Sequence, residues 1–399
     1  MMRKFIVESL CMWAREYKIK GFRFDLMGLI DVTTLKKAAE ELYKIDPDIY
    51  LYGEGWTGDS SGYDWSTGEI FPVHGTTGRE NYGAVTKAIY SELYDATNKC
   101  FIGGFNDGGR DAIRGNNDPG YGFMQQVDDA SEEKRDKIAK MIWGGNGDMG
   151  ANPKQTVNYV SCHDNFTVRD QLYYTLGDAG KGTKPSPNAV INGSITAHTL
   201  VFASNSAAFM LGGEELFRTK ELSEEDMEQV SPTTYVDMYG HKISHNSYNS
   251  PLNVNSFKWG NKKQVTIDGV NVSVNKTTSI FADLIKLHHS MPKYDYDTCL
   301  RYQRTTSAGN EVGNLSWSGK TGNEQNYNGC AGFQFDEYFI YAAGRVFGYV
   351  SAGGVSKWEQ IFTAGNKTSY DSTYQTVNLG TTSPNIGCAV IIFNANGKR

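Results

Sequence analysis

Along the first three quarters of the chain, apolar residues recur alternately at helical spacing and in short runs typical of buried strands. No capping Ser, Thr or Asp precedes the first helical stripe, so the chain is expected to start inside a helix. Thr33 or Thr34 is the predicted N-cap of the second helix. The predicted helices cover residues 5–13, 35–42, 82–97, 132–143, 196–208 and 279–289, and the predicted strands cover residues 21–26, 49–53, 101–105, 157–161 and 209–211.

This alternation of strands and helices predicts a parallel sheet built from βαβ units with right-handed crossovers. A (β/α)8 barrel needs eight strands, more than the pattern supplies, whereas a doubly wound open sheet can be smaller. Periodicity therefore leaves both architectures open. Beyond about Tyr294, short apolar runs at residues 338–341, 360–363 and 389–393 lie among Gly, Ser, Thr and Asn, which predicts a small antiparallel β domain.

Composition narrows the class of protein. The 399 residues carry a net charge of -6, which argues against a nucleic-acid partner because no broad basic face is available for phosphates. Aromatic residues make up 13%, a composition that suits sugar stacking but also ordinary core packing. The most apolar run, residues 198–212, is interrupted by three polar residues, so no membrane span or membrane partner is predicted. The six cysteines form no CxxC pair and are interpreted as buried free thiols.

The first candidate for chemistry is the strand that contains Arg23 and Asp25. Because strand side chains alternate, these two residues share one face, and Phe22 and Phe24 share the other. A neighbouring Arg23 favours the ionised form of Asp25, and an ionised, oriented carboxylate is what a glycosidase nucleophile needs. A structural ion pair at a strand end is the alternative interpretation.

Glu54 follows Asp25 by one βαβ unit, which is about 30 residues long. Both carboxyls are then expected at the same ends of adjacent parallel strands, which lie roughly 4.8 Å apart. Retaining glycosidases hold their two carboxyls about 5–5.5 Å apart, so the spacing favours retention. The charge of Asp25 and partial burial are expected to raise the pKa of Glu54 and keep it a proton donor. Trp56 is a candidate platform for a glucose ring, or else a rim aromatic.

The third candidate is the strand end that carries His163 and Asp164. His163 is expected to bind a sugar hydroxyl, and Asp164 to stabilise an oxocarbenium-like transition state. A metal pair or a satisfied buried histidine are the alternatives, and a metal is disfavoured because no HExxH-type ligand set accompanies the pair.

These three acidic strand ends, in this order, resemble the nucleophile, acid/base and transition-state-stabiliser regions of the α-amylase superfamily of glycoside hydrolases. Further segments resemble type I pullulanases over most of residues 1–292, and the tail is similar to the C-terminal β-sandwich of that family. The segments that carry the resemblance are residues 52–56, 105–107, 110–115, 158–172, 212–215, 218–220 and 246–251, with Trp259.

The resemblance implies an α/β fold, a partial (β/α)8 TIM barrel of about strands four to eight over residues 1–293, followed by an antiparallel β-sandwich over residues 294–399. It implies a retaining hydrolase of α-1,6-glucosidic branch linkages in pullulan, amylopectin or glycogen. The alternatives are an α-1,4-acting amylase, an isoamylase-like enzyme, or a non-catalytic glucan-binding fragment. A flavodoxin-like open sheet predicts a phosphate-binding Gly-rich loop after an early strand, and the sequence has none.

By the same resemblance, Asp25 attacks the anomeric carbon and Arg23 orients it. Glu54 protonates the leaving oxygen and later activates water. His163 and Asp164 hold the sugar at the point of cleavage. The resemblance implies an α-glucan partner, requires no cofactor and allows calcium, and it indicates neither a compartment nor a protein partner.

The chain departs from the family pattern in several places. Residues 64–81 differ from the segment expected after the acid/base strand, and residues 222–245 resemble an insertion. The Asp-Val-Val-Tyr-Asn-His strand and the Tyr-Asn-Trp-Gly-Tyr-type segment, both expected upstream, are absent. The expectation is therefore a truncated chain that, by itself, is not an efficient enzyme, because one wall of the cleft and two sheet edges lack partners.

Overall fold

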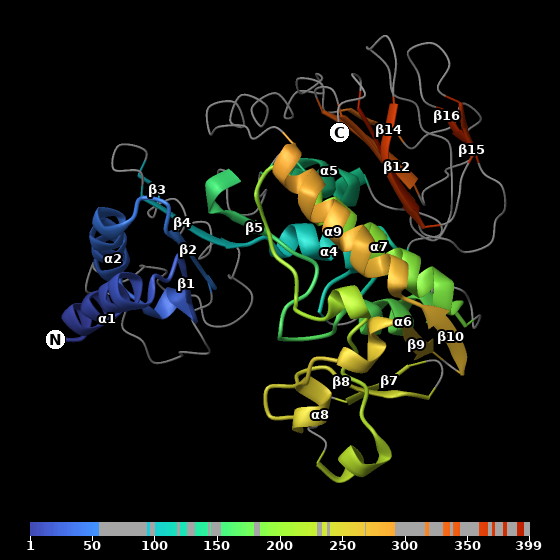
Figure 1. Cartoon of the computed structure of the whole chain (residues 1–399), viewed down its shortest axis with the longest axis horizontal. Helices are drawn as coiled ribbons and strands as arrows, with labels where there is room; N and C mark the ends of the chain where they lie inside the picture. The colour runs from blue at the N-terminus through green and yellow to red at the C-terminus, as the bar shows by residue number, and fades with distance from the viewer. Residues whose placement is uncertain are drawn as a thin grey trace.

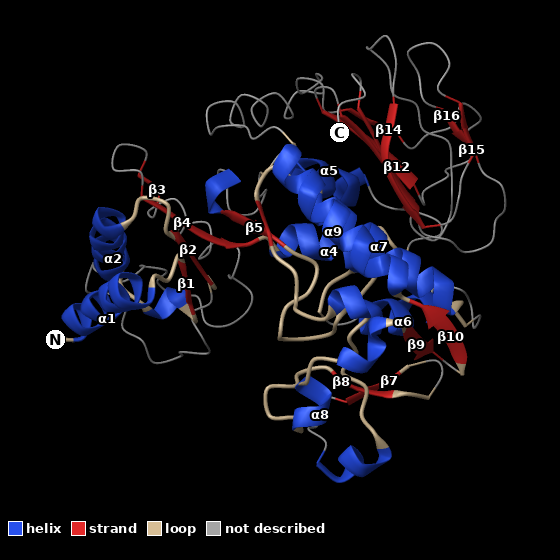
Figure 2. Ribbon diagram, viewed as in Figure 1, coloured by secondary structure: helices blue, strands red, loops and turns tan. Residues whose placement is uncertain are grey.

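The structure is a computed structural model, and its central feature is a curved parallel sheet flanked by helices (Figures 1 and 2). It describes residues 1–55, 94–95, 100–117, 120–125, 132–142, 144, 153–178, 184–229, 234–237, 240–267, 269–291, 316–318, 330–335, 338–343, 359–365, 369–371, 378–380 and 389–394.

Five strands of the central sheet are parallel and follow one another in chain order, β1-β2-β4-β5-β6, and β3 pairs antiparallel with β4. This arrangement is a parallel half-barrel, consistent with a partial TIM barrel. The strands are β1 (Gly21–Phe24), β2 (Tyr50–Gly53), β3 (Tyr94–Asp95), β4 (Cys100–Phe105), β5 (Thr156–Asn158) and β6 (Ala207–Ala208).

Along the chain, helices connect these strands and continue after the last of them (Figure 1). The α-helices are α1 (Met2–Tyr17), α2 (Val32–Ile45), α4 (Asp107–Arg114), α5 (Glu132–Ile142), α6 (Val168–Asp178), α7 (Pro187–Phe202), α8 (Leu252–Asn255) and α9 (Asn275–Ser290). The 3-10 helices are η1 (Met27–Leu29), η4 (Pro153–Gln155), η5 (Glu214–Leu216), η6 (Glu224–Gln229) and η7 (Trp259–Lys262). Two short antiparallel pairs accompany them, β7 (Thr234–Val236) with β8 (Lys242–Ser244), and β9 (Gln264–Ile267) with β10 (Val270–Ser273).

One face of β1, β2 and β4 packs against α1 and α2. Phe24, Leu51 and Ile102 belong to the same buried cluster as Leu35 and Leu42 of α2. The predicted alternation of β1 is confirmed, since Phe24 is buried on the helix side while Arg23 makes its contacts with other partners. The strand thus points its polar side chains away from the helices.

The N-cap of α2 differs from the prediction. Asp31, rather than Thr33 or Thr34, caps the helix, and its carboxylate accepts hydrogen bonds from the backbone N–H of Thr34 at 2.8 Å and from its hydroxyl at 2.6 Å. Arg3 of α1 adds an ion pair to Asp31 at 2.9 Å. The Asp31 carboxylate is favoured over a threonine hydroxyl as the cap, because it both accepts a hydrogen bond from a free backbone amide of α2 and pairs with the charge of Arg3.

The boundaries of α7 were also predicted wrongly. The helix begins after Ser186, whose hydroxyl accepts from Ala189 N at 3.2 Å, and it ends at Phe202 rather than continuing to residue 208. Ser204 and Ser206 accept hydrogen bonds from the buried Asn158 side chain at 2.9 and 2.6 Å, which holds this segment out of the helix. Strand β6 consequently starts two residues before the predicted strand at 209–211.

The predicted helix at residues 82–97 is contradicted where the structure describes it. Tyr94 and Asp95 form β3 and pair with Phe101 and Cys100 of β4. Pairing with a neighbouring strand offers these residues backbone partners that a local helical pattern cannot reveal. The rest of that prediction lies outside the described residues.

The C-terminal region contains a second sheet of five antiparallel strands in the order β11-β12-β13-β17-β14. Residues of β13 and β17 share one buried cluster with α7 and α9, so this sheet packs on the helices (Figure 1). The antiparallel character predicted for the tail is present, whereas the second layer of a sandwich and the boundary at residue 293 stay predictions. The strands of this sheet are β11 (Ser316–Ser318), β12 (Cys330–Phe335), β13 (Tyr338–Ala343), β14 (Glu359–Gly365) and β17 (Ala389–Asn394). Strands β15 (Ser369–Asp371) and β16 (Asn378–Gly380) form a separate antiparallel pair.

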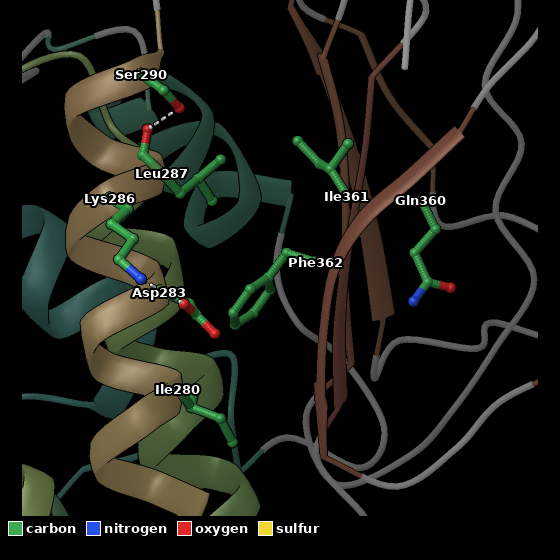
Figure 3. Close-up of a pocket in the computed structure, with 8 residues that line it drawn as sticks. All are labelled: Ile280, Asp283, Lys286, Leu287, Ser290, Gln360, Ile361 and Phe362. Carbon is green, nitrogen blue, oxygen red and sulfur yellow. Dashed lines mark hydrogen bonds and ion pairs between the residues drawn. The ribbon is translucent and has the colours of Figure 1, made fainter. Parts of the chain in front are cut away.

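A cavity of about 590 Å³ lies between α9 and β14, and Figure 3 shows side chains of both elements around it. Leu287 and Phe362 contribute apolar surface, and Asp283 and Lys286 form an ion pair at its edge. It lies at the contact between helices and the C-terminal sheet, away from the strand ends that carry the predicted site. None of the helices in the described ranges is long and apolar enough to cross a membrane.

Candidate functional site

Pairing of β1 with β2 brings Asp25 and Glu54 to the same edge of the sheet. Phe24 is in register with Gly53, so Asp25 and Glu54 are the next residues after a paired position. The backbone ladder continues past the strands, with Glu54 N donating to Phe24 O at 3.0 Å and Met27 N donating to Glu54 O at 2.7 Å. The carboxyl ends of adjacent parallel strands therefore present both side chains together, as predicted from their spacing.

Arg23 contacts both carboxylates. Its Nη1 donates to Asp25 Oδ1 at 2.9 Å, and its Nη2 lies 2.7 Å from Glu54 Oε1. The Asp25 side chain is 72% exposed, whereas that of Glu54 is only 17% exposed. One guanidinium thus pairs with an accessible carboxylate, through a hydrogen bond, and with a partly enclosed one, through a close ion pair.

The environment of Glu54 favours its protonated form. Burial raises the pKa of Glu54, the Arg23 charge lowers it, and Asp25 raises it again through its charge and through hydrogen bonding, with a raised pKa as the net result. When two neighbouring carboxyls have different surroundings, their pKa values separate, and one carboxyl can serve as a proton donor while the other is ionised.

The close approach of β1 and β2 depends on Gly53. A Cβ added at this position would lie 2.7 Å from Phe24 O and 2.8 Å from Met27 Sδ. We expect Gly53→Ala to separate the two strands and to lower the free energy of unfolding by about 1–3 kcal/mol. Urea unfolding measures the change, with Gly260→Ala as the control because nothing lies within 4 Å of its added Cβ. Equal stability of the two variants would contradict the expected clash.

Aromatic side chains from four strand segments form a layer on the face that carries Arg23. Tyr52 lies edge-on to Phe105 with ring centroids 5.6 Å apart, and Phe105 contacts both Tyr159 and Phe209 at 4.9 and 5.4 Å. The guanidinium of Arg23 lies over the Phe105 ring at 6.0 Å. This layer connects the Arg23 end of the sheet with the segment after β5.

A buried cluster at the start of α4 extends the same layer. Tyr159 donates a hydrogen bond to Asp107 Oδ1 at 2.5 Å, and Arg110 donates to the Tyr159 hydroxyl and, at 2.8 Å, to Asp111. Burial and the Asp107 charge raise the pKa of Tyr159 well above its usual value, against the opposing charge of Arg110. Asp107, Arg110 and Tyr159 lie in segments that carry the family resemblance, which by itself implies no role for them. The structure gives all three a shared contact.

His163 and Asp164 lie in the loop that follows β5, which is separated from β2 by β4. Their side chains are 59% and 45% exposed, and His163 Nε2 lies 3.7 Å from Asp164 Oδ1. The pair is therefore solvent-accessible rather than a buried structural histidine. Trp56, the predicted stacking platform, lies outside the described residues.

Glu214 and His198 are fully buried groups that sequence reasoning did not predict. Burial raises the pKa of Glu214 to about 7, although the Ser161 hydroxyl and Val168 N–H oppose the shift. Burial lowers the pKa of His198 to about 4. Burial thus favours protonated Glu214 and neutral His198 in the folded protein.

These two groups are expected to give the free energy of unfolding opposite pH dependences. Glu214 stabilises the fold fully below pH 4.5 and loses this contribution as the pH rises through 7. His198 contributes stability above pH 6.5 and loses it as the pH falls through 4. Glu214→Gln is expected to remove the first dependence and expose a loss of about 2–3 kcal/mol between pH 6.5 and 4.5.

Chemical denaturation across this pH range measures the effect. The matched variant His198→Gln is expected to show the reverse slope, with stability rising as the pH falls. If Glu214→Gln and the unmodified chain show identical slopes, the raised pKa of Glu214 is wrong.

No group of three or more His, Cys, Asp or Glu side chains within the described ranges is arranged to hold a metal ion. Among the described residues of the predicted site, Arg23 forms ion pairs with Asp25 and Glu54, and Asp164 lies beside His163.

Comparison with known proteins identifies relatives for most of the chain, although no family model matches it. The pullulanase of Bacillus subtilis (strain 168) is 30% identical over 224 residues, which cover 55% of this chain and 27% of that protein. The pullulanase of Klebsiella aerogenes is 26% identical over 333 residues, which cover 74% of this chain and 28% of that protein. The chain thus spans little more than a quarter of the length of these curated relatives.

Solved structures show the same fold. The pullulanase of Paenibacillus barengoltzii, in complex with maltohexaose and alpha-cyclodextrin, superposes with a TM-score of 0.66 at 23% identity, over 99% of this chain and 50% of that one. The pullulanase of Anoxybacillus sp. LM18-11, complexed with maltotetraose, superposes with a TM-score of 0.63 at 21% identity, over 98% of this chain and 46% of that one.

Proposed function

We propose that this chain, which is a pullulanase-like glycoside hydrolase sequence, carries the catalytic carboxylates of an enzyme that hydrolyses α-1,6-glucosidic branch linkages. The substrates would be pullulan, amylopectin or glycogen. The observation that carries the proposal is the contact of Arg23 with both Asp25 and Glu54 at the ends of adjacent parallel strands.

In the proposed mechanism Asp25 is the nucleophile. Its exposed carboxylate attacks the anomeric carbon while Glu54 protonates the leaving oxygen, so the glycosidic bond breaks as a glycosyl ester forms. Glu54, now ionised, takes a proton from water, which attacks the ester and releases Asp25. A double displacement of this kind needs two carboxyls close together, and the interaction of Glu54 with Asp25 supports that arrangement.

The other residues serve the sugar. Arg23 orients Asp25 and offsets the charge of two neighbouring carboxyls. His163 and Asp164, both accessible, hold hydroxyls of the sugar at the point of cleavage, and the Asp164 charge stabilises the ring as it becomes positive. Trp56 is proposed to stack on a glucose ring.

The neighbouring structures support a glucan as the ligand, because two of them contain maltooligosaccharides. No metal or organic cofactor enters the proposed steps. The C-terminal sheet is proposed to belong to an antiparallel β-sandwich that begins near residue 294.

Product analysis on pullulan tests the proposal against its enzymatic alternatives. The purified chain, and a longer protein that contains it, are incubated with pullulan and the products are separated. Maltotriose indicates α-1,6 cleavage, whereas panose indicates an α-1,4-acting amylase. Binding to amylopectin without turnover in either form would favour a non-catalytic glucan-binding protein and contradict the proposal.

A further inference from the structure

The ammonium group of a buried lysine holds the loop that carries Asp164. Lys220 is completely buried, and its Nζ donates to the backbone carbonyl of His163 at 2.6 Å and to that of Asn165. These carbonyls belong to the residues immediately before and after Asp164. Lys220 therefore holds the backbone on both sides of Asp164, whose side chain is 45% exposed.

The lysine is itself fixed by the first turn of α6. Asp170, only 1% exposed, accepts hydrogen bonds from Lys220 N at 2.8 Å and from the Thr219 hydroxyl. Asp170 N in turn donates to Thr167 Oγ1 at 3.1 Å. A chain of buried polar contacts thus leads from α6 through residues 219–220 to the loop, and such networks restrict conformation when every member is satisfied.

Glu214 fastens the same loop at its two ends. One of its oxygens accepts from the Ser161 hydroxyl at 2.5 Å and from Val168 N at 3.1 Å. The Ser161 contact lies before His163 and the Val168 contact lies after Asn165. Together, Lys220 and Glu214 bind the segment 161–168 at four backbone or side-chain points.

The loop needs this support because its backbone is unusual. Asn165 has a φ of 59°, in the left-handed region that non-glycine residues seldom occupy. Conformations of this kind persist where surrounding contacts determine them, and the Lys220 ammonium contacts the carbonyl of this residue. Burial lowers the pKa of Lys220 to about 8, and the charges of Asp170 and Asp164 oppose that shift.

We propose that Lys220 is a positioning residue that fixes the backbone around Asp164, so that its carboxylate faces the bound sugar in one orientation. The expected effect of Lys220 on catalysis rests on the proposed function, whereas its contacts with the loop backbone do not. An uncharged side chain lacks the ammonium donors, and a shorter side chain does not reach both carbonyls. Their loss is expected to impair the transition state more than ground-state binding, since misplacement of a stabilising charge acts chiefly on turnover.

The test compares Lys220→Met with Lys220→Gln, which retains an amide donor. The control is Lys242→Met, because Lys242 is the exposed residue of strand β8. Hydrogen exchange followed by mass spectrometry reports on residues 161–168 independently of activity. Exchange of this segment is expected to rise about tenfold in Lys220→Met, less in Lys220→Gln, and not in Lys242→Met. Lys220→Gln serves as the test variant if Lys220→Met does not fold.

Steady-state hydrolysis of pullulan by the protein that contains this chain gives the second readout. The turnover number of Lys220→Met is expected to fall about 10–100-fold with the KM changed less than about threefold. Unchanged exchange at residues 161–168, or an equal rise throughout the protein, would overturn the positioning role whatever the activity. Faster exchange of the segment with no change in turnover would overturn its catalytic consequence. Absence of pullulan hydrolysis before any substitution would instead count against the proposed function. The exchange measurement would still show whether Lys220 holds residues 161–168 in place.

Discussion

Asp25→Asn is expected to reduce pullulan hydrolysis by about 10⁴-fold or more, because an amide cannot form the glycosyl ester on which a double displacement depends. The substitution preserves the shape of the side chain and its ability to accept a hydrogen bond from Arg23 Nη1. The fold should therefore survive, and the defect should lie in the chemical step. The Asp25 side chain is 72% exposed, so the substitution does not disturb packing in the buried core.

The measurement is the turnover number of the protein that contains this chain, with Asp48→Asn as the control. Asp48 is another exposed aspartate, located just before β2, and its loss should leave turnover within a factor of two of the original. The variant also changes Glu54, whose pKa is raised in part by the Asp25 charge. Removing that charge should lower the pKa of Glu54, which NMR titration of the glutamate carboxyls would detect. Turnover close to the original in Asp25→Asn would remove this residue from the nucleophile role.

Asp164→Asn is expected to lower the turnover number by about 10²–10³-fold while the KM changes only a few-fold. The reason is that a carboxylate stabilises a sugar ring most strongly once the ring has become positive, whereas an amide retains the hydrogen bonds available in the ground state. The accessible position of Asp164, 45% exposed beside His163, is compatible with this role.

Steady-state kinetics on pullulan and calorimetric binding of maltotriose separate the two effects. Asp283→Asn on α9 is the matched control, because Asp283 is 61% exposed and pairs only with Lys286 among the contacts described for it. A variant whose KM rises while its turnover number is unchanged would show that Asp164 contributes uniform binding to substrate and transition state, and would contradict the proposed stabilisation of charge.

Local patterns in the sequence were sufficient for several features of this protein. Alternation within residues 21–26 separated Arg23 and Asp25 from Phe24, because neighbouring side chains of a strand point to opposite faces. The spacing of one βαβ unit placed Glu54 on the adjacent parallel strand. The runs near residues 338–341, 360–363 and 389–393 identified strands of an antiparallel sheet. Each of these inferences depends on residues close together in the chain.

Other features depended on contacts between residues distant in the sequence. The end of α7 is set by Asn158, more than forty residues earlier, and β3 exists because β4 offers it backbone partners. Asp31 rather than Thr34 caps α2, because Asp31 also forms an ion pair with Arg3 of another helix. Periodicity cannot predict such outcomes, since it records only which face of an element is apolar.

The support of the candidate site shows the same division. The sequence alone placed Asp25 and Glu54 at the ends of adjacent strands, because strand alternation and βαβ spacing are local properties, whereas Asp164 lies in the loop beyond the end of β5. Only the tertiary structure decided that Arg23 contacts both Asp25 and Glu54, and that the loop carrying Asp164 is gripped by Lys220. Burial decided the charge of Glu214, since desolvation raises its pKa to about 7 and no local pattern encodes that environment. The physical reason is that the orientation and ionisation of a side chain depend on every group around it, and folding brings most of those groups from elsewhere in the chain.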